Sequence, residues 1–211
     1  MTQETADITI QKLTLGIYEA NAYIVGCSET GQAIIIDAPG SFAEFSPHIQ
    51  DYDIKIITLT HTHLDHTQAL TELRHGLKVP LAMHDAEADQ MTPPPEKLLR
   101  DSETISVGKL QFKVIHTPGH TPGGICLLCG KHLFSGDTLF PGGPGKTFQP
   151  AQFRQVVDSI TKKLFLLADD TLVHPGHGLD TVLEKEKAEF AAFANRSHPD
   201  DICGDVLWLT S

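Results

Sequence analysis

The segment THTHLDHTQAL (residues 60–70) places three histidines and one aspartate within six positions, directly after the apolar run IKIITLT (54–60). A run this rich in apolar and β-branched residues predicts a strand buried on both faces. His61 and His63 are two residues apart, so in an extended segment both imidazoles leave the same side of the chain, with Cα atoms roughly 7 Å apart. Two imidazoles in that arrangement can converge on one ion.

The second half of this cluster points elsewhere. Asp65 and His66 come just before TQALTELRH (67–75), whose leucines fall at helical spacing. The change from extended to helical backbone turns these two side chains away from the first pair. They are therefore expected to serve a second, nearby ion.

Three later residues have the same setting, because each follows a strand-like run and lies beside glycine. His120 lies in HTPGHTPGG, Asp137 in FSGDTLF and His177 in VHPGHG. Glycine allows the backbone to approach a compact centre closely. A set of histidines and aspartates suits divalent metals, with zinc as the first expectation and iron or manganese as alternatives.

Other histidines and aspartates have less certain roles in the sequence. Asp37, which ends the strand-like run QAIIID, is expected either to orient a ligating imidazole or to be an ordinary turn aspartate. His116 and His174 precede ligand candidates by three or four residues and are expected either to support them or to pack in the core. Isolated histidines are expected only to pack or face solvent: His48, His75, His84, His132 and His198.

The remaining texture of the chain alternates between strands and helices. Strands are expected over residues 8–15, 21–26, 32–37, 54–60, 110–116, 124–130, 131–137 and 171–174. Helices are expected over residues 41–52 with an interruption at Pro47, and over 67–75, 83–91, 153–167 and 182–194. Two sheets packed face to face with helices outside would bury every apolar face, so residues 1–211 are expected to form one domain.

Composition limits the classes of partner. The formal net charge of −11, with lysines and arginines scattered along the chain, argues against nucleic acid as a ligand. The N-terminal segment MTQETADITI lacks the features of a secretory leader, and no apolar run reaches the length needed to span a membrane. These observations predict a cytoplasmic protein with a small-molecule partner and no membrane association.

The four cysteines are too few and too scattered to predict a disulfide framework. Cys126 and Cys129 form a C-x-x-C motif, but they lie in the strand-like run GICLLCG, which would point them to opposite faces. Buried, unreactive thiols are expected at both positions.

Taken together, H-x-H-x-D-H, the histidine of PGHT, the aspartate of SGDTLF and the histidine of PGHG resemble the motifs of the metallo-β-lactamase superfamily, and more closely those of its glyoxalase II-like hydrolases. The resemblance runs over about residues 8–195. It implies an α/β fold in which two mixed β-sheets and outer helices form an αββα sandwich, with the metals at one edge between the sheets.

The resemblance also implies roles for seven residues. One ion would be held by His61, His63 and His120, a second by Asp65, His66 and His177, and both by Asp137. Two such ions would share a hydroxide. It forms at neutral pH because coordination lowers the pKa of water from about 16 to about 7. That hydroxide would attack a substrate carbonyl, with Asp65 and Asp137 as the catalytic carboxylates.

Thioester hydrolysis is the first functional expectation from this resemblance. Dedicated β-lactamases of the superfamily lack an aspartate at the position of Asp137, which argues against antibiotic hydrolysis as the main activity. Lys146 resembles the family's glutathione-contacting lysine and Phe148 replaces its tyrosine, so both are candidate substrate-binding residues. Full-length glyoxalase II enzymes have an added helical region that supplies further cationic contacts, and no such region is expected after the final predicted helix, 182–194.

Three alternatives stay open at the level of sequence. Persulfide dioxygenases of the same superfamily use a single iron, held by two histidines and an aspartate, and consume oxygen. Lactone hydrolysis differs from thioester hydrolysis only in its leaving group. A non-enzymatic metal-binding module is disfavoured because all seven candidate ligands are present.

Overall fold

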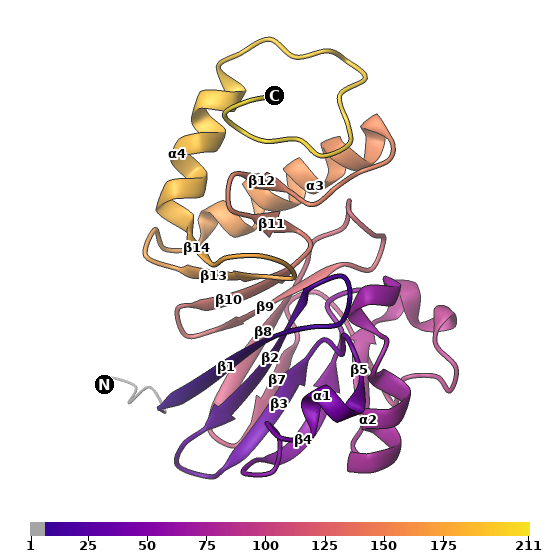
Figure 1. The fold of residues 1–211 in the computed structure, drawn as a ribbon. Helices are drawn as coiled ribbons and strands as arrows, with labels where there is room; N and C mark the ends of the chain where they lie inside the picture. Colours follow the sequence, from indigo (N-terminus) through magenta and orange to yellow (C-terminus); the bar gives the residue numbers. More distant parts are fainter. Residues whose placement is uncertain (1–6) are drawn as a thin grey trace.

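Two six-stranded sheets pack face to face in the computed structural model, which describes residues 7–211 (Figure 1). Residues 1–6, which begin the segment expected to lack a leader, lie outside the described residues. The strands of the first sheet, in spatial order, are β1 (Ile8–Leu15), β2 (Ala20–Cys27), β3 (Gln32–Ile36), β4 (Asp53–Thr58), β5 (Leu81–His84) and β6 (Lys97–Leu99). This sheet is mixed, because β1, β2 and β3 pair antiparallel whereas β3, β4, β5 and β6 pair parallel.

The second sheet is also mixed and has the spatial order β14-β13-β10-β9-β8-β7. Its strands are β7 (Thr104–Val107), β8 (Leu110–His116), β9 (Ile125–Cys129), β10 (His132–Gly136), β13 (Leu172–Pro175) and β14 (Thr181–Val182). Strands β10 and β13 are parallel neighbours, so their carboxyl ends lie side by side. A separate hairpin, β11 (Leu139–Phe140) with β12 (Gly143–Pro144), follows β10.

Helices cover the outer face of each sheet (Figure 1). The first sheet carries α1 (Phe42–Phe45) and α2 (Leu70–Leu77), and the second carries α3 (Pro150–Lys162) and α4 (Leu183–Ala194). Short 3₁₀ turns occur at η1 (Leu64–His66), η2 (Asp85–Gln90) and η3 (Leu164–Leu166). This arrangement confirms the predicted αββα sandwich.

Side-chain alternation along the strands produces the layers. In β2, Tyr23 and Val25 pack into the core between the sheets, whereas Ala22 and Ile24 pack into the core beneath α1 and α2. Both faces of this strand are buried because each sheet has a second sheet on one side and helices on the other. Within residues 7–211, no helix combines the length and apolar character needed to cross a bilayer.

The helix expected over 153–167 is divided into α3, which ends at Lys162, and η3, and two other predicted helices differ more from the structure. The helix expected over 41–52 ends at Phe45, because the ring of Pro47 prevents the next turn from forming. The helix expected over 83–91 is wrong at its start, since Met83 and His84 belong to β5 and only η2 follows. Pairing of β5 with both β4 and β6 explains the strand, because tertiary contacts outweigh weak local helix propensity.

Candidate metal centre

The seven candidate ligands come from four loops at one edge of the sandwich. Four of them lie between β4 and α2, His120 lies between β8 and β9, Asp137 follows β10, and His177 follows β13. Backbone hydrogen bonds join two of these loops to strands of the opposite sheet: Ile125 N of β9 donates to Thr60 O at 2.9 Å, and Asn21 N of β2 donates to Gly176 O at 2.7 Å. The sequence-distant candidates are therefore brought together, as predicted.

The first group consists of three imidazoles. His63 Nδ1 lies 3.1 Å from His61 Nε2 and 2.9 Å from His120 Nε2. Nitrogens that bind one zinc ion at about 2.0–2.1 Å are separated by roughly 3 Å. His61, His63 and His120 thus form a group of the size that one ion requires.

The second group consists of Asp65, His66 and His177. Asp65 Oδ2 lies 3.1 Å from His177 Nε2 and 3.7 Å from His66 Nε2. These atoms face a common space next to the first group, since the ring centroids of His61 and His66 are 4.3 Å apart. The structure therefore separates the H-x-H-x-D-H motif into two halves, as its spacing predicts.

Asp137 lies between the two groups. One of its oxygens, Oδ2, is 3.5 Å from His120 Nε2 of the first group and 3.8 Å from His177 Nε2 of the second. The other, Oδ1, is 3.4 Å from His66 Nε2. A carboxylate in this position can contact cations on both sides.

Unpartnered polar atoms test whether these residues fit a metal. His66 Nε2 and Asp137 Oδ1 are buried and have no hydrogen-bond partner among the described residues. An unsatisfied buried polar atom costs about 1–3 kcal/mol, and a cation placed between these two atoms, which lie 3.4 Å apart, would satisfy both. Divalent cations satisfy this donor set of imidazole nitrogens and carboxylate oxygens.

Neighbouring polar groups fix which nitrogen of two imidazoles, His66 and His120, faces the centre. Asp37 Oδ2 accepts a hydrogen bond from His66 Nδ1 at 3.0 Å, and the carbonyl oxygen of Lys146 accepts one from His120 Nδ1 at 2.8 Å. Both contacts place the proton on Nδ1 and leave a lone pair on Nε2. The structure places Asp37 against an imidazole of the candidate centre, and the metal-binding role of that imidazole stays a prediction.

Asp37 is itself held rigidly. Its two carboxylate oxygens accept hydrogen bonds from the amide and hydroxyl of Thr60, both at 2.7 Å. Its φ of 62° is left-handed, a conformation in which Asp and Asn are enriched. The carboxylate therefore links the end of β3 to the loop that begins the histidine cluster.

Glu87 has a supporting role that sequence reasoning missed. This carboxylate, 1% exposed, accepts hydrogen bonds from Thr62 N at 3.1 Å and from Gly123 N at 2.8 Å. It thus ties the loop of the clustered histidines to the loop of His120. Its partners are distant in sequence and no local pattern marks it.

Two glycines bring the backbone unusually close to Asp137. A Cβ at Gly176 would lie 2.1 Å from Asp137 Oδ1, and one at Gly145 would lie 1.8 Å from Asp137 O. A side chain at Gly176 would displace the carboxylate, and one at Gly145 would displace the backbone of Asp137. The expectation that glycines beside the candidate ligands permit close approach is confirmed at Gly176, which precedes His177.

Burial and mutual proximity set the protonation of the centre. Burial, with the neighbouring His66, lowers the pKa of His61 well below its ordinary value, and burial with His120 lowers that of His63. Burial alone would raise the pKa of Asp137, but the surrounding imidazoles, His66 foremost, hold it well below its usual range. Although burial opposes it, the neighbouring Asp37 raises the pKa of His66, and the hydrogen bond with Asp65 raises that of His177. Neutral imidazoles and ionised carboxylates are the forms that bind metals, so an ion bound at these two histidines would release protons.

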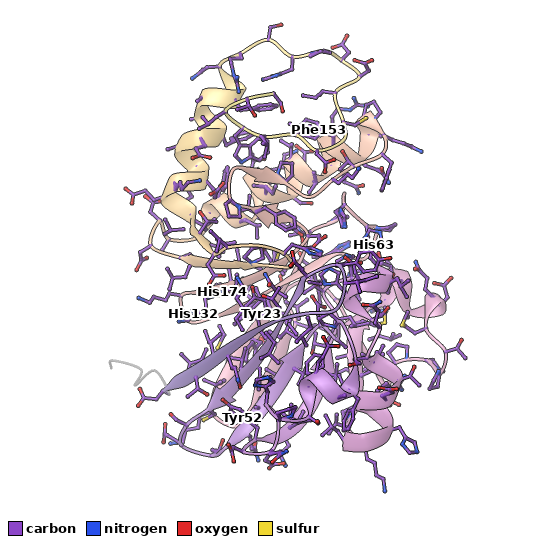
Figure 2. The ribbon with its side chains drawn as sticks, viewed as in Figure 1. Tyr23, Tyr52, His63, His132, Phe153 and His174 are labelled. Atoms are coloured by element: carbon purple, nitrogen blue, oxygen red, sulfur yellow. The ribbon has the colours of Figure 1, made fainter. Side chains whose placement is uncertain are left out.

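The other histidines lie elsewhere. His116 Nε2 contacts the carbonyl oxygen of Pro122 at 2.9 Å, and its ring stacks on His84 at 3.8 Å. His174 contacts Asp180 at 2.8 Å and His132 at 3.0 Å. Figure 2 shows His132 and His174 on the opposite side of the view from His63, and the contacts of His174 with His132 and Asp180 are those of packing rather than of support for a candidate ligand.

A cavity of about 320 Å³ opens beside the centre and is lined in part by His120, Asp137, His177 and Lys146. Lys146 Nζ lies 3.1 Å from Asp205 Oδ2. Phe148 is 68% exposed and does not line this cavity, so its contact with a substrate stays a prediction.

Two curated relatives extend over most of the chain. An uncharacterised protein of Aquifex aeolicus is 33% identical over 205 residues, which are 88% of this chain and 96% of the relative. The hydroxyacylglutathione hydrolase GloC of Haemophilus influenzae is 29% identical over 203 residues, which are 85% of this chain and 95% of the relative.

Solved structures of several differently named proteins are similar to this chain. BLEG-1, a B3 metallo-beta-lactamase, is 28% identical with a TM-score of 0.79, over 85% of this chain and 97% of its own. ETHE1 from Myxococcus xanthus is 31% identical with a TM-score of 0.77, over 90% of this chain and 86% of its own. TTHA1623, solved in a di-iron-bound form, is 30% identical with a TM-score of 0.69, over 84% of this chain and 96% of its own.

The family itself is shown by a model that matches most of the fold. Residues 15–179 match the model of the metallo-beta-lactamase superfamily. This range contains all seven candidate ligands, with His177 close to its end. With its αββα sandwich and its cluster of histidines and aspartates, this chain belongs to the metallo-beta-lactamase superfamily.

Proposed function

We propose that the chain is a metal-dependent hydrolase that cleaves thioesters, as glyoxalase II enzymes do. The observation that carries the proposal is the position of Asp137 between two groups of ligand atoms, with oxygens 3.4 Å from His66 Nε2 and 3.5 Å from His120 Nε2. The similarity to GloC, whose name states hydroxyacylglutathione hydrolysis, supports the thioester as substrate.

In this proposal seven residues hold two ions. Three imidazoles hold the first, Asp65, His66 and His177 hold the second, and Asp137 contacts both; the imidazoles of the first group are His61, His63 and His120. Two divalent ions supply a water of lowered pKa and polarise a substrate carbonyl. Zinc is the first expectation, and the di-iron form of TTHA1623 makes iron an explicit alternative.

Asp65 is the proposed proton acceptor. Its hydrogen bond with His177 lowers its pKa, so the carboxylate is ionised at neutral pH. With its side chain 24% exposed, it can accept a proton from the attacking water and release it to solvent.

The cavity beside the centre is the proposed place for the rest of a small-molecule substrate. Lys146 lines it, and Phe148 follows two residues later. The proposal assigns no role to nucleic acid or membranes and places the protein in the cytoplasm.

The test joins metal content to turnover. Mass spectrometry of protein purified without added metal is expected to find two ions per chain, and the same preparation is expected to hydrolyse S-lactoylglutathione. His75→Ala, which removes an exposed histidine outside the centre, is the matched control and is expected to change neither result. Fully loaded protein that leaves every thioester intact would refute the proposal.

A second candidate is a mononuclear iron persulfide dioxygenase, and the similarity to ETHE1 is compatible with it. The centre contains groups of two histidines and one aspartate, among them His61, His66 and Asp137. One iron per chain together with thiol-dependent oxygen uptake would favour this reaction over hydrolysis. The similarity to BLEG-1 adds a β-lactam to the panel of substrates that the same preparation should be given.

A further inference from the structure

Three segments form the walls of the cavity beside the metal centre. The centre contributes His120, Asp137 and His177, the region around β12 contributes a second wall that includes Lys146, and the C-terminal segment contributes the third, residues 205–207. A substrate whose reacting bond lies at Asp137 must therefore place its remaining part between Lys146 and the C-terminal segment.

The C-terminal wall is held firmly on both sides of Asp205. On one side, Gly204 and Thr147 exchange backbone hydrogen bonds of 2.8 and 3.1 Å. On the other, Trp208 N donates to Gly142 O at 2.7 Å, and the indole is fully buried. In Figure 1 this last segment passes over the outside of α3 and α4 and returns towards β12. Asp205 is thus presented to the cavity by a fixed backbone.

Asp205 forms an ion pair with Lys146, the positively charged residue that lines the cavity. Among the lining residues in the described part of the chain, Lys146 alone carries a fixed positive charge. Its Nζ lies 3.1 Å from Asp205 Oδ2, and the two side chains are 51% and 74% exposed. An exposed pair of this kind adds little to the stability of a fold, so its main effect is on the potential inside the cavity.

Away from the metal centre, the lining beside this pair consists of glycines and apolar residues. Phe140, Pro144, Val206 and Leu207 all border the cavity. An anionic substrate group that reaches Lys146 must displace Asp205 or remain beside its carboxylate, where like charges repel. An uncharged group meets neither obstacle and contacts the apolar walls.

We propose that Asp205 is a specificity-determining residue that pairs with Lys146, so that the cavity favours thioesters whose thiol portion is uncharged over those whose thiol portion is anionic. The inference rests on the proposed thioester hydrolysis. It assigns the discrimination to the C-terminal segment rather than to the metal ligands.

The test compares two thioesters that share one acyl group. S-lactoylglutathione carries an anionic thiol portion, and the lactoyl thioester of N-acetylcysteamine carries a neutral one. Asp205→Asn is expected to raise kcat/KM for the anionic thioester about two- to fivefold relative to the neutral one, the size of effect that an exposed ion pair supports. Asp201→Asn, an equal change of charge at an exposed residue of the same segment, is the control and is expected to leave this ratio unchanged.

A double variant tests whether Asp205 acts through Lys146. In a Lys146→Ala background, Asp205→Asn is expected to leave the ratio of the two kcat/KM values unchanged, because there is no cation left to release. An increase of the same size in both backgrounds would overturn the proposal, and so would the absence of any increase in the single variant. Thermal denaturation of each variant checks the fold, and Asp205→Ser serves if the asparagine variant is unstable.

Failure of the proposed function is distinguishable from failure of this inference. If the wild-type protein turns over neither thioester, hydrolysis is refuted, and calorimetric titration with glutathione then tests Asp205 by itself. Affinity about two- to fivefold higher in Asp205→Asn than in the wild type supports the inference. Equal affinity, or no binding by either protein at millimolar glutathione, overturns it.

Discussion

Asp37→Asn changes the hydrogen bond that orients the candidate metal ligand His66 but leaves every candidate ligand in place. The carboxylate accepts hydrogen bonds from Thr60 N and Thr60 Oγ1, both at 2.7 Å, and from His66 Nδ1 at 3.0 Å. Asparagine keeps one oxygen, which the amide of Thr60 must retain because that amide can only donate. The new NH₂ group then faces His66, so the imidazole must accept at Nδ1 and carry its proton on Nε2.

The expected magnitude follows from that change of tautomer. His66 Nε2 is the atom that faces Asp137 at 3.4 Å, and once protonated it cannot bind an ion. Loss of such a supporting contact lowers metal affinity by about 10- to 100-fold, which corresponds to about 1.4–2.7 kcal/mol. The affinity of the second group for its ion is expected to fall by this amount. The first should stay close to its wild-type affinity, because its three imidazoles make no hydrogen bond with Asp37.

The assay is a metal titration against a chromophoric competitor, with bound ions counted by mass spectrometry. Asparagine tolerates the left-handed backbone at this position, φ 62°, so thermal denaturation should show a folded protein. Asp53→Asn is the matched control, since it removes the same charge from a half-exposed pair with Lys55. Wild-type affinity for both ions in Asp37→Asn would refute the reasoning from tautomers.

Three further predictions concern the bridge, the second ion and the thiols. Asp137→Ala is expected to lower occupancy of both sites and abolish hydrolysis, and turnover at the wild-type rate would remove the bridging role. His177→Ala should leave close to one ion per chain, so an unchanged count of two would contradict its assignment. Burial raises the pKa of Cys126 and of Cys129 to about 11, so at pH 8 only about one thiol in a thousand is ionised. Iodoacetamide should therefore modify Cys203 of the folded protein before either of them, with mass spectrometry of peptides as the readout, and rapid labelling of Cys126 would show that its burial is not maintained in solution.

Long, strongly patterned strands were predictable from sequence, and short ones were not. The predicted bounds of residues 8–15 and 110–116 coincide with β1 and β8. Strand β14 contains two residues and β6 three, too few for alternation to stand out from a loop. These short strands are defined by pairing with partners distant in sequence, as Thr181 of β14 pairs with Val173 of β13.

The metal centre was predictable to the extent that its chemistry is local. The geometry of the H-x-H-x-D-H motif follows from its local sequence. The backbone changes from an extended segment at His63 to a turn at Leu64, and this change divides the motif into two halves. The carbonyl of Lys146 and the carboxylate of Glu87 were not predictable, since each acts on a residue 26 or more positions away. A backbone carbonyl, moreover, leaves no trace in residue identity.

The division of the ligands between the two sheets links metal binding to folding. Four ligands follow β4 of the first sheet, and the other three, His120, Asp137 and His177, come from loops of the second. Each group of ligand atoms contains a residue from both sheets, since His120 joins the first group and His177 the second. An ion bound at either group must therefore hold the sheets together as well as prepare a reaction. Ligands that bind only the folded state stabilise it by about 2.7 kcal/mol at a free concentration one hundred times Kd. The candidate metal ligands are thus expected to hold the two sheets together through a bound ion as well as to support a reaction. Substitution of any of them is expected to alter stability together with activity.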